Sequence, residues 1–346
     1  MFKVYTVSFG CDPEFFFKND KGIVGAEKVF PKDGLTVGIN NSKFIIDGVQ
    51  AELNPAPSTC RQLLANEISR CFAGLDEVMK TKGVVADFSQ TVEVDKENFD
   101  NLSDDSKKFG CSASKNIYKS PSKSKIKVDP MVYRKRSAGG HIHLGRTSDI
   151  TSEVLDNPKK IVPILDILLG NTCVLIDRDI GNIERRKNYG RAGEHRTPKH
   201  GLEYRTLSNF WLKNYKLMSF VFGMARFAVA VVVNKKDKEF LKAVKMKDIE
   251  KAINKNDFKL AYENFLKIEP IISEIAEEVE RFGYSVPLTV STMQYFKHFI
   301  NKGMDYWFKE TPLEHWNKHT KTLNLTDGWE TFLATTVKQD FEQENK

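Results

Sequence analysis

The sequence predicts an α+β fold, because strand-like and helix-like segments fall in different parts of the chain. Short apolar or alternating runs typical of strands occupy residues 4–9, 14–17, 43–46 and 50–53, and the Asp47-Gly48 pair predicts a turn between the last two. A strongly apolar helix is expected over residues 212–233, and amphipathic helices are expected after it. With 346 residues the chain can form one large domain or two of ordinary size.

Three further elements lie between these segments. Apolar residues at helical spacing predict a helix over residues 60–81, with Ser58 or Thr59 as its cap; they are Leu63, Leu64, Ile68, Phe72, Leu75 and Met79. Residues 139–145 form a short apolar strand, and residues 161–176 a helix with Pro163 in its first turn. Residues 87–136 are mostly polar and are expected to form loops, and aromatic helices are expected over residues 295–316.

Composition excludes several classes of protein. The chain is 40% hydrophobic and 29% charged, which is typical of soluble proteins. The N-terminus lacks the long apolar run of a signal peptide, and residues 220–233 are too few to span a bilayer, so we expect no membrane association. The five cysteines are scattered without C-x-x-C spacing, which favours a reduced cytoplasmic compartment and no structural zinc knuckle.

The positive charge is concentrated in residues 115–136. This basic segment holds eight lysines and arginines against one acid, so its net charge of +7 equals that of the whole chain. Its Ser, Pro and Lys content predicts a loop. Such a loop either attracts an anionic partner, such as a nucleotide or nucleic acid, or is simply solvated.

Two acidic motifs are candidates for metal binding. Asp12 and Glu14 are two residues apart in G-C-D-P-E-F-F-F, so on a strand both carboxylates face one side and suit a hard cation such as Mg²⁺ or Mn²⁺. Glu52 lies in a half-buried strand-like run, G-V-Q-A-E-L-N-P. The alternatives are a turn before an edge strand for the first motif and a salt-bridged glutamate for the second.

The basic and imidazole side chains fall in two further motifs. His141 and His143, in G-G-H-I-H-L-G, face the same way on a strand, unlike the helical H-E-x-x-H of zinc peptidases; a single such histidine is commonly a satisfied core residue. Residues 191–205 contain three arginines, Arg191, Arg196 and Arg205, around Glu203. A carboxylate beside guanidinium groups suits a metal next to a transferring phosphate, whereas the alternative is a surface salt-bridge cluster.

The order of these four motifs resembles the glutamine synthetase and glutamate–cysteine ligase superfamily. D-P-E-F-F, Q-x-E-x-N, G-G-H-x-H-L-G and H-G-x-E-Y-R, with F-G-C at residues 109–111, are most similar to the carboxylate–amine (COOH–NH2) ligases described from phage genomes. The resemblance covers roughly residues 10–233. It implies a glutamine-synthetase-like catalytic fold over residues 1–233, a curved, mainly antiparallel sheet with helices on its convex face. The C-terminal residues 234–346 would then be a helical extension packed on it.

The resemblance also implies roles for individual residues. Glu14 and Glu52 would hold one Mg²⁺ or Mn²⁺, and Asp12, His141 and Glu203 a second, with Asp47 as a possible further carboxylate. His143 would bind a phosphate of ATP, and Arg205 the transferring phosphoryl group. Arg191 and Arg196 would bind ATP phosphates or the substrate carboxylate. Residues from Phe109 to Tyr118 would shape the acceptor pocket.

The implied activity is ATP-dependent ligation of a carboxylate to an amine through an acyl phosphate, with two or more metal ions. The substrates would be small molecules or peptides, and the compartment would be the cytoplasm, that of the host if a phage encodes the chain. Two features depart from glutamine synthetases: the D-P-E motif begins at residue 12, leaving no room for their N-terminal domain, and its first acid is aspartate. We therefore expect an amine-bearing compound or peptide rather than ammonia.

Three alternatives remain open from the sequence. A metal-dependent hydrolase would use His141 and His143 on zinc without ATP. A guanidino-kinase-like phosphotransferase would stop at a phosphorylated product. A basic nucleic-acid-binding protein would use the basic segment, although nucleic acid is not an expected partner of the ligase. The sequence indicates neither the substrates nor the oligomeric state.

Overall fold

The protein is built around one large antiparallel sheet. The structure, a computed structural model, describes residues 2–3, 5–37, 40–110, 114–119, 128–280 and Trp316. Eight strands of the main sheet follow the order β3-β4-β5-β1-β10-β12-β11-β8, and β2 and β6 also pair with β1. The bounds along that order are Leu35–Val37, Ser42–Asp47, Gln50–Asn54, Ser8–Asn19, Gly140–Gly145, Gly201–Tyr204, Glu194–Arg196 and Lys115–Asn116, and those of β2 and β6 are Gly22–Val24 and Val85–Asp87.

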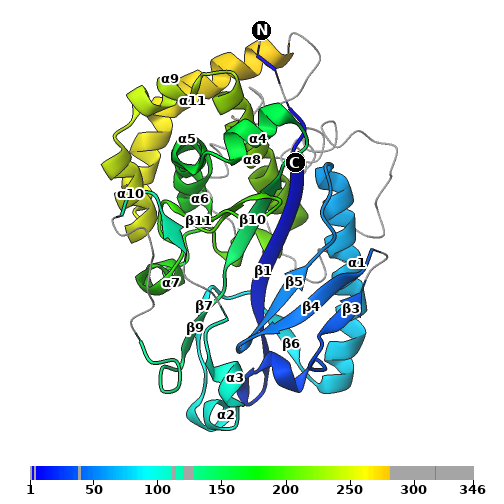
Figure 1. The fold of residues 1–346 in the computed structure, drawn as a ribbon. Helices are drawn as coiled ribbons and strands as arrows, with labels where there is room; N and C mark the ends of the chain where they lie inside the picture. The colour runs from blue at the N-terminus through cyan, green and yellow to red at the C-terminus, as the bar shows by residue number, and fades with distance from the viewer. Residues whose placement is uncertain are drawn as a thin grey trace, which may run out of the picture.

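Strand β1 is the centre of this sheet (Figure 1). It pairs with β5 on one side and β10 on the other, so segments far apart in the sequence become neighbours. We expected two strands, at residues 4–9 and 14–17. The structure instead has one strand that begins at Ser8 and continues through Pro13, while the backbone N–H of Glu14 donates to Gly139. The predicted pair around Asp47-Gly48 is confirmed as β4 and β5, with Gly48 at φ 65° in the turn.

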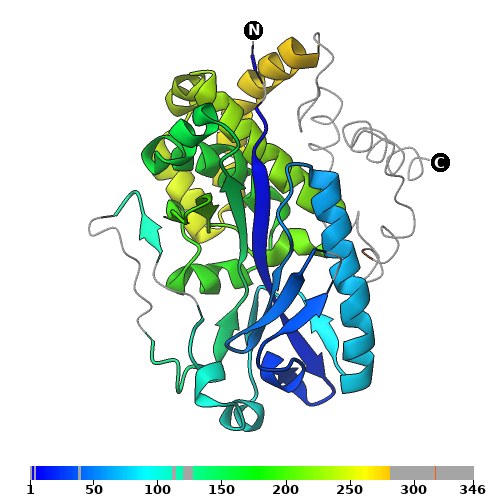
Figure 2. The ribbon, with the colours of Figure 1, turned by 45° about the vertical axis from the view of Figure 1, so that its right-hand side comes forward.

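The two faces of β1 differ in chemistry because successive side chains point to opposite sides. Phe9 contacts Phe222 of α8 (Tyr215–Val233), with ring centroids 5.3 Å apart, and Phe15 contacts Phe72 of α1 (Arg61–Lys82) at 5.9 Å. Both helices therefore cover the same side of the sheet, as Figure 2 shows for α1. Asp12 and Glu14 point to the other side. The predicted mainly antiparallel sheet with helices is confirmed, and its closer likeness to glutamine synthetase stays a prediction.

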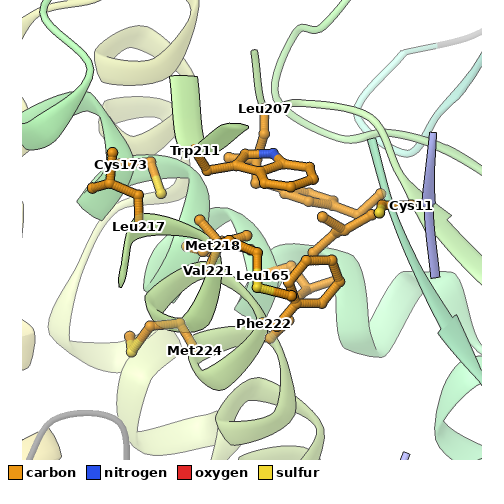
Figure 3. Packing of buried hydrophobic residues seen from close by; sticks show 14 of the residues in the cluster. Cys11, Leu165, Cys173, Leu207, Trp211, Leu217, Met218, Val221, Phe222 and Met224 are labelled. Carbon is orange, nitrogen blue, oxygen red and sulfur yellow. The ribbon is translucent and has the colours of Figure 1, made fainter. Parts of the chain in front are cut away.

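Further helices follow β10 in the chain, and α4 and α5 among them pack on α8. They are α4 (Asp149–Leu155), α5 (Pro158–Leu165), α6 (Asn171–Ile176), α7 (Gly181–Asn188), α9 (Asp237–Ala243), α10 (Met246–Lys255) and α11 (Phe258–Glu280). Helices α10 and α11 pack on α6, and their apolar residues join the main core. Figure 3 shows Trp211 above Met218 and Phe222 of α8, and its indole N–H donates to the Gly140 carbonyl at 3.0 Å, which ties this core to β10.

Several expectations need correction. The helix predicted over 161–176 begins at Pro158, so Pro163 lies inside it, and a π-helical turn at Asp166–Gly170 separates α5 from α6. The predicted helix at 60–81 is confirmed as α1. Leu63, one of the apolar residues that predicted it, is 52% exposed and does not belong to the buried face of α1. Its N-cap residue is Cys60, whose N–H donates to the Ser58 hydroxyl. The apolar helix at 212–233 is α8, preceded by a 3-10 turn at Asn209–Lys213.

The region 87–136 is more structured than the predicted loops. It contains β7 (Thr91–Glu93), which pairs with β9 (Lys135–Ser137), two short helices, α2 (Lys96–Asp100) and α3 (Asp104–Lys107), and the strand β8. Arg136, part of the basic segment, is buried rather than solvated, since its guanidinium donates to the carbonyls of Lys107 and Pro130 and lies over Phe109.

Two predictions meet the limits of the described residues. Within them, no single helix has the length and hydropathy needed to cross a membrane, and only the bent pair of Leu217–Val233 with Asp237–Ala243 passes that test together. The aromatic helices predicted over 295–316 lie outside the described residues except for Trp316, which is buried.

Candidate functional site

The side of the sheet opposite α1 and α8 gathers most of the predicted site residues. Strands β5, β1, β10 and β12 are consecutive, and their register places Glu52 opposite Glu14, Asp12 opposite His141, and His143 opposite Glu203. Each of these side chains alternates with an apolar neighbour that faces the helices, such as Ile142 or Leu202. Side chains from four strands therefore point to one side.

Asp12, His143 and Glu203 form the first group of possible ligands. One donor atom from each lies within 4.8 Å of the others. The His143 Nε2 atom is 3.3 Å from Asp12 Oδ1, and these two atoms and Glu203 Oε1 are buried without a hydrogen bond from the described residues. His141 approaches the same two carboxylates, since its Nδ1 lies 3.4 Å from Asp12 and 3.8 Å from Glu203. Buried ligand atoms that converge without hydrogen bonds make this group a candidate cation site.

Glu14, Asp47 and Glu52 form the second group, again with ligand atoms within 4.8 Å of one another. One oxygen of Glu14 accepts hydrogen bonds from the Gly139 N–H at 2.7 Å and the Tyr189 hydroxyl at 3.0 Å. Glu52 accepts one from its neighbour Asn54 at 2.9 Å. These bonds hold two of the three carboxylates in place.

The two groups influence each other electrostatically. Burial, together with the carboxylates of Asp12, Asp47 and Glu14, raises the pKa of Glu52 to about 9. Burial also raises the pKa of Asp47 to about 7. The carboxylates of Glu14 and Asp12 add to this rise, whereas Arg205 and Arg196 lower the pKa. Carboxylates this close repel one another in a poorly solvated site, so a bound cation would stabilise their ionised forms.

The imidazoles have the opposite effect on the first group. Burial alone would raise the pKa of Asp12, but His141 and His143 outweigh it and hold this pKa below its usual value. Burial lowers the pKa of His143, yet the Asp12 carboxylate outweighs it and raises the pKa. Asp12 is therefore ionised, in contact with both histidines.

The three predicted arginines lie in different surroundings. Arg205 is fully buried with its Nε 3.2 Å from Glu203 Oε1, and an Arg196 nitrogen is 3.5 Å from the same oxygen. Arg191 instead directs its guanidinium to the carbonyls of Arg186 and Lys187 at the end of α7. Two of the three arginines therefore flank the first group of ligands.

Gly110 of the F-G-C motif positions Asp47. A Cβ at residue 110 would lie 1.2 Å from Asp47 Oδ1, so only glycine leaves room for this carboxylate. Tyr118, which we expected in the acceptor pocket, donates its hydroxyl to Asp166 at 2.8 Å. Cys111 lies outside the described residues.

Two residues at the site were not singled out from the sequence. The His200 ring stacks on His143, and the nearest ring nitrogens of the two are 2.9 Å apart. Its position in H-G-L-E-Y-R was the available signal. Tyr189 binds Glu14 from the loop after α7, and no local pattern indicates this contact because it joins residues 175 positions apart.

The donor set decides which cations fit. Carboxylate oxygens predominate and an imidazole takes part in the first group, which suits Mg²⁺ or Mn²⁺. No thiolate is found in either group, unlike many structural zinc sites. The guanidinium groups of Arg196 and Arg205 would repel a cation bound beside Glu203, unless an anion such as phosphate lay between the cation and the guanidinium groups.

Comparison with known proteins agrees with this chemistry. Residues 112–310, more than half of the chain, match the family described as Phage phiEco32-like COOH.NH2 ligase-type 2. The chain belongs to this carboxylate–amine ligase family. The matched span contains β10, β11 and β12 with their histidines, arginines and Glu203, whereas β1 and β5, which carry Asp12, Glu14 and Glu52, precede it.

The other comparisons add little. One similar solved structure is a bifunctional glutathione synthetase from Pasteurella multocida, with 11% sequence identity and a TM-score of 0.36 over 86% of this chain. The chain spans about half, 52%, of the length of that protein. No curated protein is similar to the chain in sequence.

Proposed function

We propose that this family member is an ATP-dependent ligase that joins a carboxylate to an amine through an acyl phosphate. The supporting observation is the convergence of two groups of metal-ligand atoms on one side of the sheet, with Arg196 and Arg205 beside Glu203. The substrates would be small molecules or peptides.

Two divalent ions, Mg²⁺ or Mn²⁺, fit these residues. Glu14, Asp47 and Glu52 would hold one ion, and Asp12, His143 and Glu203 the other, with His141 beside the second. Bound ions would neutralise charge on the phosphate oxygens of ATP.

The arginines would bind the transferring group. Arg205 and Arg196 carry fixed guanidinium groups that match phosphate oxygens and would stabilise the charge that develops on them. Arg191 would bind another ATP phosphate or the substrate carboxylate, after releasing the carbonyls that it now contacts. Burial of Arg205 fixes its geometry before substrate arrives, which reduces the cost of reorganisation.

The bonds made and broken in this reaction balance. The carboxylate oxygen attacks the γ-phosphorus of ATP and ADP leaves, giving an acyl phosphate. The amine nitrogen then attacks the acyl carbon, phosphate leaves, and the nitrogen loses a proton to give the amide.

A hydroxylamine assay tests the proposal. The purified chain, ATP and Mg²⁺ would be incubated with amino acids, peptides and polyamines, and release of phosphate and ADP would be measured. Hydroxylamine converts an acyl phosphate into a hydroxamate, so we expect a hydroxamate with one class of acid, and none with Glu203→Gln. The exposed Glu153 of α4 provides a matched control, Glu153→Gln, which should behave as wild type.

Three results would overturn the proposal. Phosphorylation of a guanidine without a hydroxamate would indicate a phosphotransferase. Turnover in the absence of ATP would indicate a hydrolase. Tight, salt-sensitive binding of nucleic acid that persists in Glu203→Gln, with no ATP consumption, would indicate a nucleic-acid-binding protein.

A further inference from the structure

A polar cavity lies at the β8–β11 edge of the sheet. Its volume is about 670 Å³, within the usual range for small-molecule sites. The wall between β8 and the start of α5 carries six side chains with hydrogen-bond donors: Lys115, Asn116, Lys119, Lys159, His195 and Thr197.

This cavity is on the opposite side of the sheet from the ligase site. Arg196 pairs with Glu203 and faces the metal-ligand groups, whereas its neighbour His195 pairs with Tyr204, which faces the helices. Lys115 lies directly opposite His195 in the β8–β11 pair and shares its side of the sheet. An occupant of the cavity would therefore not contact the ligase site, but it would contact the same strand, β11.

The chemistry of the wall favours an anion. Three lysines line it, and Lys115 donates to the Thr197 hydroxyl at 3.1 Å, so an ammonium and a hydroxyl lie side by side. The first turn of α5, which carries Lys159, adds the positive end of a helix dipole. Lysine is a common phosphate ligand because its ammonium is a compact charge with three donors.

The acids nearby do not cancel this charge. Asp156 also lines the cavity, but its carboxylate accepts from Arg146, with Nε 2.9 Å from Oδ1. Glu250 interacts electrostatically with Lys119, and this leaves the ammonium groups of Lys115 and Lys159 to set the potential.

We propose that this cavity, separate from the ligase site, binds a phosphate-bearing small molecule. The basic segment then has a specific use, since Lys115 and Lys119 belong to it. Because β11 also carries Arg196, an occupant would contact this strand from the side opposite the ligase site and hold it in place.

Lysine labelling read by mass spectrometry tests the proposal, with inorganic pyrophosphate as the probe. The full chain would be treated with an amine-reactive reagent with and without pyrophosphate, at ionic strength matched with NaCl so that general screening is equal. We expect labelling of Lys115 and Lys159 to fall at least threefold. Lys160, exposed on the same helix outside the cavity wall, is the matched control and should be unchanged.

Three variants locate the probe. Lys115→Gln combined with Lys159→Gln should weaken pyrophosphate protection of Lys119 at least about fivefold, whereas Lys160→Gln should not. Arg196→Gln, which alters the ligase site, should leave the protection intact. Equal labelling with and without pyrophosphate would overturn the proposal, and so would protection that disappears in Arg196→Gln. Because no turnover is measured, these results do not depend on whether the ligase proposal holds.

Discussion

At the scale of single residues, Glu203 lies beside three basic side chains. His141, Arg196 and Arg205 all lie within 4 Å of its Oε1 atom. This carboxylate therefore links His141 of β10 to Arg196 of β11 and to Arg205, which directly follows β12.

Substitution Glu203→Gln keeps the size of the side chain and removes its charge. We expect Mn²⁺ affinity to fall at least about tenfold and ligation at least about a hundredfold, because one ligand is lost and two guanidinium charges remain. Mn²⁺ titration followed by electron paramagnetic resonance measures the first effect and the hydroxamate assay the second. Unchanged Mn²⁺ affinity would exclude Glu203 as a ligand.

Gly110 offers a test of the second ligand group. In Gly110→Ala the new methyl group would displace the Asp47 carboxylate, so Mn²⁺ binding should weaken by about the same factor as in Asp47→Asn. If both changes act on one carboxylate, the double variant should bind no more weakly than either single variant. Additive losses would show that Gly110 acts elsewhere.

At the scale of elements, Asp166 joins three segments on the helix-covered side of the sheet. Its carboxyl group accepts hydrogen bonds from Tyr204 of β12 at 2.6 Å and from Tyr118 at 2.8 Å, and it lies in the π-helical turn between α5 and α6. The side chain is fully buried, and burial raises its pKa to about 7 despite these hydroxyl groups. Strand β12 is thereby attached to the helices directly beside Glu203.

This raised pKa predicts a pH dependence of stability. Between about 4 and about 7 the folded state binds more protons than the unfolded state, so this carboxyl group stabilises the fold at low pH and loses its contribution as pH rises through about 7. The unfolding free energy of wild type minus that of Asp166→Asn should fall by about 1.4 kcal/mol per pH unit in that window. Urea unfolding at several pH values measures it, and a constant difference would contradict the assignment.

At the scale of the whole molecule, Trp316 connects distant parts of the chain. It is fully buried, its ring lies against Phe72 of α1 at 6.0 Å, and its indole N–H donates to the Leu212 carbonyl at 2.6 Å. Its own carbonyl accepts from Ser69 at 2.6 Å. The residue therefore joins α1 to the segment that leads into α8.

Removing this side chain should destabilise the whole fold. We expect Trp316→Ala to lower the free energy of unfolding by about 3–5 kcal/mol, as for large buried aromatic residues. Trp316→Phe keeps a ring and loses the hydrogen bond, so its loss should be smaller. Denaturant unfolding compares the two, and a change below about 0.5 kcal/mol for Trp316→Ala would show that this residue does not belong to the core.

Prediction from sequence succeeded where the signal was local. The helix at 60–81 and the hairpin around Asp47-Gly48 follow from spacing and turn chemistry within a few residues. It failed at Pro163, where burial of the surrounding apolar residues outweighs the preference of proline for a first turn. The burial of Arg136 was not expected either, because one of its partners, the Lys107 carbonyl, lies outside the basic segment.

The sequence by itself determined which side of each strand carries chemistry, because alternation along a strand is a property of the backbone. It also supplied the resemblance to carboxylate–amine ligases, which agrees with the family match over residues 112–310. Only the tertiary structure decided that Asp47 joins Glu14 and Glu52, that His143 joins Asp12 and Glu203, and that Arg191 turns to α7. Those choices depend on the register between strands and on loop contacts, which residues far apart in the chain set together.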